Sequence, residues 1–238
     1  MEFRILGTLE IRDGAGRLLA PPRRKQRLLL VVLLLRANTP VSTESLLDLL
    51  WPDTAPASAR ANLQSYVSDL RRLLHAAEPA DPPRLHREPG GYRLRAGPQE
   101  LDAAVFETLA DQGRQALAEQ RHATAAERLA QALARWRGPI LEDLPLPAAL
   151  QPEIERLEEL RMMVLEDSIQ ARLGLAEPAV LAAELAELTA RHPLRERLWA
   201  QLMLALYRAG RQADALDAYQ RIYRLLDQDL GVQPGPAL

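Results

Sequence analysis

Residues 58–74 read SARANLQSYVSDLRRLL, and this stretch predicts an amphipathic helix whose two faces differ in chemistry. One face is an apolar stripe at helical spacing, formed by Ala59, Leu63, Val67, Leu70 and Leu74. The other face carries side chains that can bind bases or phosphates: Arg60, Asn62, Gln64, Ser65, Ser68, Arg71 and Arg72. Such a helix could fill a major groove. A solvated surface helix has much the same composition, however, so the flanking sequence must decide between the two.

The N-terminal residues predict a small antiparallel sheet. Residues 3–11 are strand-like, a turn follows at Asp13, Gly14 and Gly16, and the extended pattern resumes at residues 17–19.

Two further helices are predicted between this sheet and residue 58. Residues 23–37, RRKQRLLLVVLLLRA, join a basic start to a long apolar run, which would also fit a strand but whose length favours a buried helix. A second helix at residues 44–51 can be capped by Ser42 or Thr43 and ends before Pro52. Its inward-facing residues are Leu46, Leu47, Leu49 and Leu50. Ser58 then stands at the N-cap position of the third helix.

A hairpin is predicted after the third helix. Residues 75–83 have the composition of a loop, and two short strand candidates at residues 84–87 and 92–95 flank the turn sequence PGG. Gly90 and Gly91 are expected to supply the positive φ angles of that turn. Three helices followed by a hairpin form a winged helix-turn-helix, in which the third helix enters the major groove and the hairpin lies along the backbone or in the neighbouring minor groove.

Charge separates the two halves of the chain. Residues 1–97 contain 15 Arg and Lys against 10 Asp and Glu, net +5, whereas residues 98–238 contain 15 against 22, net −7. This asymmetry assigns polyanion binding to the N-terminal half. The predicted DNA contacts outside the third helix are Arg23, Arg24, Lys25 and Arg27 at the basic helix start, and Arg87, Tyr92 and Arg93 in the wing.

From residue 99 onward the sequence predicts helices and little else. The last helical pair has tetratricopeptide-like spacing in Trp199, Leu202, Leu206, Tyr207, Gly210, Ala215 and Tyr219, with Met203 at the usual glycine position. A fainter pair has Gly113, Ala116, Ala125, Leu129 and Ala132 about a turn at residues 120–122. Helices are also expected at about residues 152–173 and 178–191, so roughly three helical pairs would stack as a superhelix. The predicted fold is therefore mainly α with a small β component: a winged helix-turn-helix followed by an all-α repeat domain.

Several kinds of site are not indicated by the sequence. The absence of cysteine excludes disulfides and thiolate metal sites or nucleophiles. The four histidines lack metal-ligand spacing: His75, His86, His122 and His192. No Walker-type glycine-rich loop is visible, so we expect no cofactor, no metal and no enzyme activity.

Other residues receive structural interpretations. The paired acids Glu158-Glu159 and Glu166-Asp167 are interpreted as a solvated helix face. The tryptophans, Trp51, Trp136 and Trp199, are interpreted as core anchors. The longest apolar run, residues 28–35, is far shorter than a membrane span, and Met1 is not followed by a signal peptide, so we expect an intracellular protein without a membrane partner.

The order of these segments resembles a known family. The N-terminal half resembles the OmpR-type DNA-binding domain in FRILGTLEIRDG, RRKQRLLLVVLLL, VSTESLLDLLWPD, SARANLQSYVSDLRRLL and PGGYRL. The C-terminal half resembles the bacterial transcriptional activator domain in LDAAVFE, ALARWRGPILEDL, RLEELRMMVLED and the run from residue 192 to residue 238. Together the two halves are similar to the Streptomyces antibiotic regulatory proteins over essentially the whole chain. This similarity predicts a winged domain at residues 1–97 and an activator domain at residues 98–238.

The resemblance implies a transcriptional activator that binds direct repeats near the promoter −35 region, usually as two side-by-side protomers. It also implies recruitment of the RNA polymerase holoenzyme, through its sigma factor and core subunits, to a secondary-metabolite or antibiotic gene cluster. A cytoplasmic, nucleoid-associated location follows from this role. Larger members continue into ATPase modules beyond the position of Pro234, Gly235 and Pro236, so the chain is either a small member or a fragment.

Two other functions remain open from the sequence. One is a tetratricopeptide-like protein-binding adaptor whose winged domain has lost DNA affinity. The other is an enzyme or nucleotide sensor, for which neither a phosphate loop nor a cluster of titratable residues is visible. Within the preferred hypothesis, Arg71 and Arg72 are candidate phosphate contacts, and Asn62 or Gln64 is a candidate base contact. The helical half is expected to pack against the winged domain and to support contacts with a second protomer or with polymerase.

Overall fold

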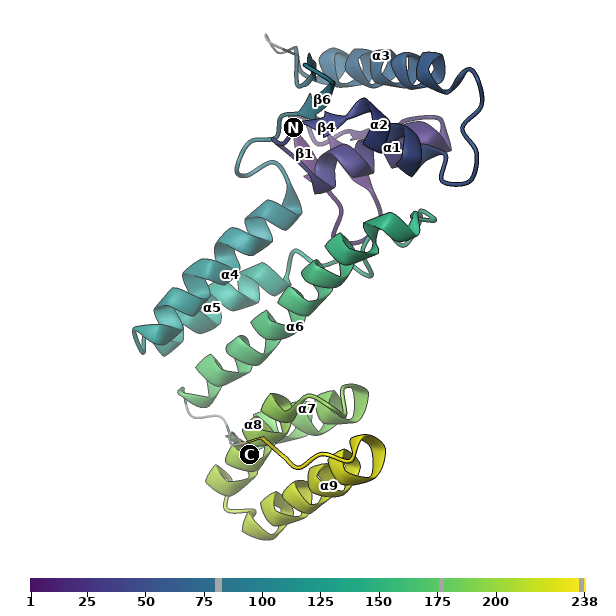
Figure 1. Cartoon of the computed structure of the whole chain (residues 1–238). Coiled ribbons are helices and arrows are strands. Elements are labelled where there is room, and N and C mark those ends of the chain that lie inside the picture. Colours follow the sequence, from purple (N-terminus) through teal and green to yellow (C-terminus); the bar gives the residue numbers. More distant parts are fainter. Residues whose placement is uncertain (80–82, 176–177, 236–237) are drawn as a thin grey trace. The chain divides into compact units, whose positions relative to one another are not determined.

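A computed structural model describes residues 1–79, 83–175, 178–235 and 238 of the chain (Figure 1). It contains two compact units. Unit 1 comprises residues 1–108 and 132–160, and unit 2 comprises residues 109–131 and 161–238. Unit 1 holds small sheets and a helical winged domain, whereas the described part of unit 2 is helical. The predicted fold class is thus confirmed.

The N-terminal sheet of unit 1 has the strand order β1-β2-β3 and is antiparallel, with bounds Glu2–Arg4, Glu10–Arg12 and Leu18–Leu19. The segment that we expect to be strand-like, residues 3–11, contributes to two strands, β1 and β2. The chain reverses between β1 and β2, so Phe3 pairs with Ile11 and both side chains are fully buried. The alternating pattern on either side of the reversal is compatible with one strand or two, and only the cross-strand pairing distinguishes them.

The first two helices occur close to their predicted positions. Helix α1 spans Arg24–Leu35, and most of its apolar run is fully buried, which confirms a helix rather than a strand. Helix α2 spans Thr43–Leu50, and the Ser42 hydroxyl accepts a hydrogen bond from the Ser45 N–H at 3.0 Å. Ser42 is therefore the cap. Leu47 is only half-buried, unlike the other leucines expected to face inward.

Helix α3 spans Ala59–Ala77 and buries all five residues of the predicted apolar stripe. The helix continues past residue 74, so the first residues of the expected loop at 75–83 are helical, while residues 80–82 lie outside the described ranges. Ser58 occupies the N-cap position, but its hydroxyl makes no capping bond. Instead it accepts a hydrogen bond from the Asn62 side-chain amide at 3.1 Å.

The wing is a hairpin of β5 (Leu85–Glu88) and β6 (Gly91–Leu94), as predicted, but a further strand joins it. Strand β4 (Val41–Ser42) pairs with β6, giving the order β4-β6-β5. Gly90 has a φ of +82° and forms the tight turn. Gly91 does not adopt a positive φ; it is required because a Cβ there would overlap the carbonyl oxygen of Val41.

Residues 132–160 complete unit 1 and hold the N-terminal sheet. The Arg137 N–H donates to the Leu6 carbonyl at 2.9 Å, and the Leu141 N–H donates to the Gly7 carbonyl at 2.7 Å. Asp102 accepts hydrogen bonds from the Ile5 N–H at 2.8 Å and the Leu6 N–H at 3.0 Å. Burial raises the pKa of Asp102 above its ordinary value of 3.8 despite these bonds. The domain division that we expect between residues 97 and 98 stays a prediction.

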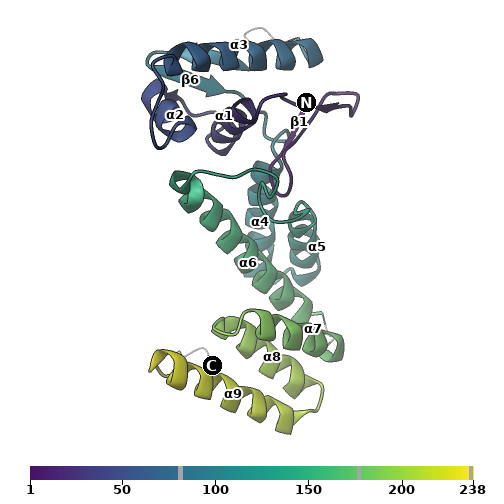
Figure 2. The ribbon, with the colours of Figure 1, turned by 90° about the vertical axis from the view of Figure 1, so that its right-hand side faces the viewer.

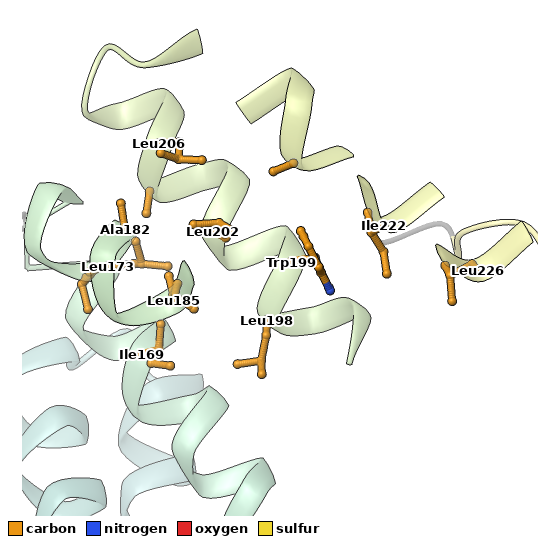
Figure 3. Close-up of a cluster of buried hydrophobic side chains, with 13 residues drawn as sticks. Ile169, Leu173, Ala182, Leu185, Leu198, Trp199, Leu202, Leu206, Ile222 and Leu226 are labelled. Carbon is orange, nitrogen blue, oxygen red and sulfur yellow. The ribbon is translucent and has the colours of Figure 1, made fainter. Parts of the chain in front are cut away.

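The remaining helices are α4 (Asp102–Ala118), α5 (His122–Leu133), α6 (Gln151–Leu173), α7 (Pro178–Arg191), α8 (Glu196–Arg208) and α9 (Gln212–Leu230), with a short 3-10 turn η1 at Ala148–Leu150. Within unit 2, α8 packs against both α7 and α9. Figure 3 shows the resulting core, in which Trp199, Leu202 and Leu206 of α8 lie among residues of α6, α7 and α9. The fainter pair is also formed, and Gly113 of α4 packs against Leu129 of α5.

One interpretation of the acidic pairs is wrong. Glu158 and Glu159 are exposed, but Glu166 and Asp167 are buried, with exposed fractions of 5% and 6%. Glu166 Oε1 pairs with Arg195 Nη1 at 2.9 Å, and Asp167 Oδ1 pairs with Arg197 Nη2 at 2.5 Å. Both arginines lie near the start of α8, so the acids join α6 to α8 instead of facing water. Sequence spacing along α6 could not reveal partners about thirty residues away.

The tryptophans differ in burial. Trp136 and Trp199 are buried, as expected of core anchors, whereas Trp51 is half-buried and stacks on Tyr66 with ring centroids 6.3 Å apart. Among the helices in the described ranges, none has the length and apolar character needed to cross a membrane.

Candidate nucleic-acid interface

The exposed face of α3 carries most of the predicted base- and phosphate-binding side chains. Figures 1 and 2 show α3 at the edge of its unit, with α1 and α2 on one side of it. Opposite the buried stripe, five predicted contact residues are exposed: Arg60, Gln64, Ser65, Ser68 and Arg72. The structure thus brings these five together on one continuous surface. His75 is exposed on the same face one turn further on, and recognising that the helix extends past residue 74 would have added it.

Asn62 lies apart from this face. Its side chain is half-buried on the flank of α3, and its amide donates to the Ser58 hydroxyl. The amide is therefore occupied within the helix start. Sequence spacing put Asn62 with the other polar residues because it could not show this local bond.

Arg71 joins α3 to the wing. Its Nε donates to the backbone carbonyl of Leu85 at 2.7 Å, and the side chain is half-buried. Strand β5 is also anchored at its start, because Arg84, the residue before it, makes two 2.7 Å hydrogen bonds to the Glu100 carboxylate. Burial alone would raise the pKa of Glu100, but the hydrogen bonds from Arg84 and from the Gly97 N–H keep it below its ordinary value of 4.5. These contacts fix the wing beside α3.

Arg72 is held from a different direction. Its guanidinium pairs with the Asp69 carboxylate, three residues earlier on α3. The second Asp69 oxygen accepts a hydrogen bond from Gln26 Nε2 of α1 at 2.7 Å. Gln26 is only 1% exposed, and its own carbonyl oxygen accepts from the Arg23 N–H at 3.3 Å. A buried side chain of α1 is thereby connected to an exposed arginine of α3.

The wing places its three predicted contact residues in different environments. Arg87 is exposed, and its side chain has no hydrogen-bond or ion-pair partner among the described residues. Arg93 is half-buried, and its Nε lies 3.1 Å from Glu88 Oε1, which also contacts His86 Nε2 at 3.0 Å. Tyr92 is 6% exposed and pairs with Val41 across the sheet, so it belongs to the core of the winged domain.

The basic residues at the start of α1 also differ in exposure and in bonding. Arg23 and Arg24 are exposed. Lys25 instead donates to the Leu50 carbonyl at 2.8 Å and lies over the Trp51 ring at 4.1 Å. Burial, and to a lesser extent the charge of Arg24, lowers the pKa of Lys25. Arg27 pairs with Asp143. Arg23 and Arg24 are therefore the members of this group whose surface is open.

The arrangement can bind a polyanion. An exposed helix face of arginine, glutamine and serine lies beside a hairpin that presents a further exposed arginine, and both are fixed by buried or half-buried side chains. Arginine can bond phosphate or guanine, and glutamine can bond adenine, so the same surface has groups for the backbone and for base edges. Among the described residues, no group of three or more His, Asp or Glu side chains is placed to hold a metal ion.

Comparison with known proteins gives matches over both halves of the chain. A family described as bacterial transcriptional activator domain matches residues 101–238, and one described as transcriptional regulatory protein, C terminal, matches residues 21–94. Regulatory protein DnrI of Streptomyces peucetius is 38% identical over all of this chain and 89% of its own length. Regulatory protein AfsR of Streptomyces coelicolor is 40% identical, but the chain spans only 23% of it.

A solved structure is also similar. Mycobacterium tuberculosis EmbR, determined in complex with a low affinity phosphopeptide, matches with a TM-score of 0.93 and 36% sequence identity. The match covers 99% of this chain and 62% of that chain. The chain thus spans most of one relative and only part of the longer ones.

Proposed function

The chain belongs to the Streptomyces antibiotic regulatory protein family and is a transcriptional regulator, and from this premise we propose that it binds promoter DNA sequence-specifically and activates transcription. The observation that carries the proposal is the exposed polar face of α3, fixed beside the wing by Arg71. Helix α3 enters the major groove, and the β5–β6 hairpin lies along the neighbouring backbone. No enzyme activity is part of this function.

The proposed contact surface is narrower than the sequence predicts. It comprises Arg60, Gln64, Ser65, Ser68 and Arg72 of α3, Arg87 of the wing, and Arg23 and Arg24 before and at the start of α1. Asn62, Lys25 and Tyr92 are omitted, because their polar groups are bonded within the domain or their surface is buried. Arg71 and Arg93 contribute by shaping the wing.

The finer features of the function follow the family. We propose that two protomers bind direct repeats near the promoter −35 region and recruit the RNA polymerase holoenzyme, through its sigma factor and core subunits, to an antibiotic or other secondary-metabolite gene cluster. The protein would act in the cytoplasm, at the nucleoid. Unit 2 supports a protein-binding role because α9 leaves Leu216, Tyr219 and Tyr223 exposed on one face at spacings of three and four residues.

Footprinting tests the proposal. The intact chain is incubated with the promoter regions next to its gene at physiological salt, and its unfolding transition is recorded in the same buffer. Two protected direct repeats on one face of the DNA would support both the binding mode and the number of protomers. In vitro transcription with purified holoenzyme then measures activation. A folded protein that protects no DNA would refute the proposal in favour of the adaptor function.

A further inference from the structure

We propose that Asp69 orients the Arg72 guanidinium so that Arg72 reads a base, whereas Arg60 and Arg87, which have no such partner among the described residues, bind phosphate. The inference rests on the proposed function, since it concerns how the same surface achieves sequence specificity. Asp69 touches no DNA in this scheme and is a positioning residue.

Hydrogen bonds connect the buried Gln26 of α1, through Asp69, to the exposed Arg72. Gln26 is buried in α1, and both ends of its amide are bonded, one to the Arg23 N–H and the other to Asp69. Asp69 is therefore bonded to a side chain that is itself buried and bonded at both ends of its amide. Because Asp69 Oδ1 pairs with Arg72, the position of the core is transmitted to the Arg72 guanidinium, whose side chain is 78% exposed.

Base reading and phosphate binding place different geometric demands on an arginine. Reading guanine requires two parallel hydrogen bonds from a guanidinium in one plane and one direction, so a base-reading arginine gains from being held before it binds. Phosphate contact is less demanding, because the oxygens accept bonds from many directions and the contact carries no sequence information. Arg60 and Arg87 have no carboxylate partner among the described residues, which suits mobile phosphate contacts.

The negative charge of Asp69 also affects how this part of α3 attracts DNA. A carboxylate beside Arg72 repels phosphate, and the Asp69–Arg72 pair carries no net charge. Such a pair gains little from the counterion release that drives non-specific binding. Arg72 can still donate its remaining N–H groups to a base edge. Asp69 thus lowers the attraction of this part of α3 for DNA in general while leaving a directed donor for one base pair.

The experiment compares Asp69→Asn with the wild type on a specific promoter site and on unrelated DNA over a range of salt concentrations. Asparagine removes the charge and keeps one acceptor, so it cannot hold both Gln26 and Arg72. We expect binding to unrelated DNA to tighten and its salt slope to steepen by about one unit. The ratio of specific to non-specific affinity should fall roughly 10-fold or more, as for the loss of one base contact.

Matched variants separate the two classes of arginine. Arg72→Lys keeps the charge but not the paired donors, so it should lower the specificity ratio with an unchanged salt slope. Arg87→Ala should weaken both DNAs alike, reduce the slope by about one unit and leave the ratio unchanged. Since both side chains project from the surface, these variants also serve if Asp69→Asn unfolds.

The outcomes are distinct. An unchanged ratio of specific to non-specific affinity in Asp69→Asn or in Arg72→Lys would overturn the inference. A merely structural role of Asp69 predicts that Asp69→Asn lowers the affinity for both DNAs equally and lowers the melting temperature, and that result would overturn it too. If the wild type binds neither DNA, the proposed function itself fails. Binding by the wild type with no effect of the Asp69 and Arg72 variants rejects the inference alone.

Discussion

Gly91 of the wing lies directly against the carbonyl of Val41, close enough that a Cβ on residue 91 would overlap its oxygen and lie 2.8 Å from its carbon. The contact arises because β4 pairs with β6, with Ser42 opposite Gly91 in the register. The wing is thus attached to the segment that caps α2, and a single hydrogen atom at residue 91 sets how closely the two strands approach.

Gly91→Ala should therefore destabilise the winged domain by about 1–3 kcal/mol, since backbone on both strands must move to accommodate the methyl group. The matched control is Gly14→Ala, because Gly14 has no positive φ and a methyl group there would meet no atom within 4 Å. Thermal unfolding of the two variants and the wild type measures the difference. Equal melting temperatures for the two variants would contradict the assigned contact.

Replacing Arg71 tests whether it anchors the wing or contacts phosphate. Arg71→Met removes the bond to the Leu85 carbonyl and should lower the free energy of unfolding by about 1–2 kcal/mol. DNA affinity should also fall, because the wing loses its attachment to α3. The salt slope decides between the two roles: an anchor leaves it nearly unchanged, whereas a phosphate contact reduces it by about one unit with no loss of stability.

The Glu100–Arg84 pair predicts a pH dependence of stability. The pKa of Glu100 is lower in the folded protein than its ordinary 4.5, so the ionised carboxylate stabilises the fold above that pH. This stabilisation is lost as the pH falls below 4.5 and through the folded-state pKa. We expect the difference in unfolding free energy between wild type and Glu100→Gln to be constant near neutral pH, at about 1–2 kcal/mol, and to shrink in acid. Urea unfolding at a series of pH values checks this, and a difference that grows in acid would be the wrong sign.

The buried acid Glu166 should matter far more than a surface acid in the same unit. Glu166→Ala removes a buried carboxylate that pairs with Arg195 at 2.9 Å and lies 3.6 Å from Arg197, which should cost about 2–4 kcal/mol. The control is Glu187→Ala, which breaks the pair with Arg191, where the two side chains are 68% and 72% exposed. This variant should change the free energy of unfolding by less than about 0.5 kcal/mol. Urea denaturation of both variants gives the comparison, and similar costs would show that the burial of Glu166 does not determine its contribution.

Much of the fold could be predicted because its signals are local. The five apolar residues of α3 repeat at helical spacing, and all five are buried; the wing turn and the tetratricopeptide-like spacing of Trp199, Leu202 and Leu206 are local patterns of the same kind. Periodicity records which side of an element faces the core, and that face is set by neighbours within a few residues.

The candidate site could be predicted only in outline. The sequence identified α3 and its polar residues, but not that Asn62 bonds to Ser58, that Arg71 reaches the wing, or that Tyr92 is buried. Each of these facts depends on which atom lies opposite a side chain once the helices and strands have packed, and residues of one type look alike in the sequence whether they are free or bonded.

The sequence by itself therefore determined the helices and the wing hairpin, which faces are apolar, and that the polar face of residues 58–74 stands in a positively charged half of the chain. Tertiary structure alone decided the roles of individual polar groups. Gln26 and Asp69 are 43 residues apart, and Glu166 and Arg195 are 29 apart. Such pairs leave no periodic signal, because their energy comes from proximity and burial that exist only after the chain has folded.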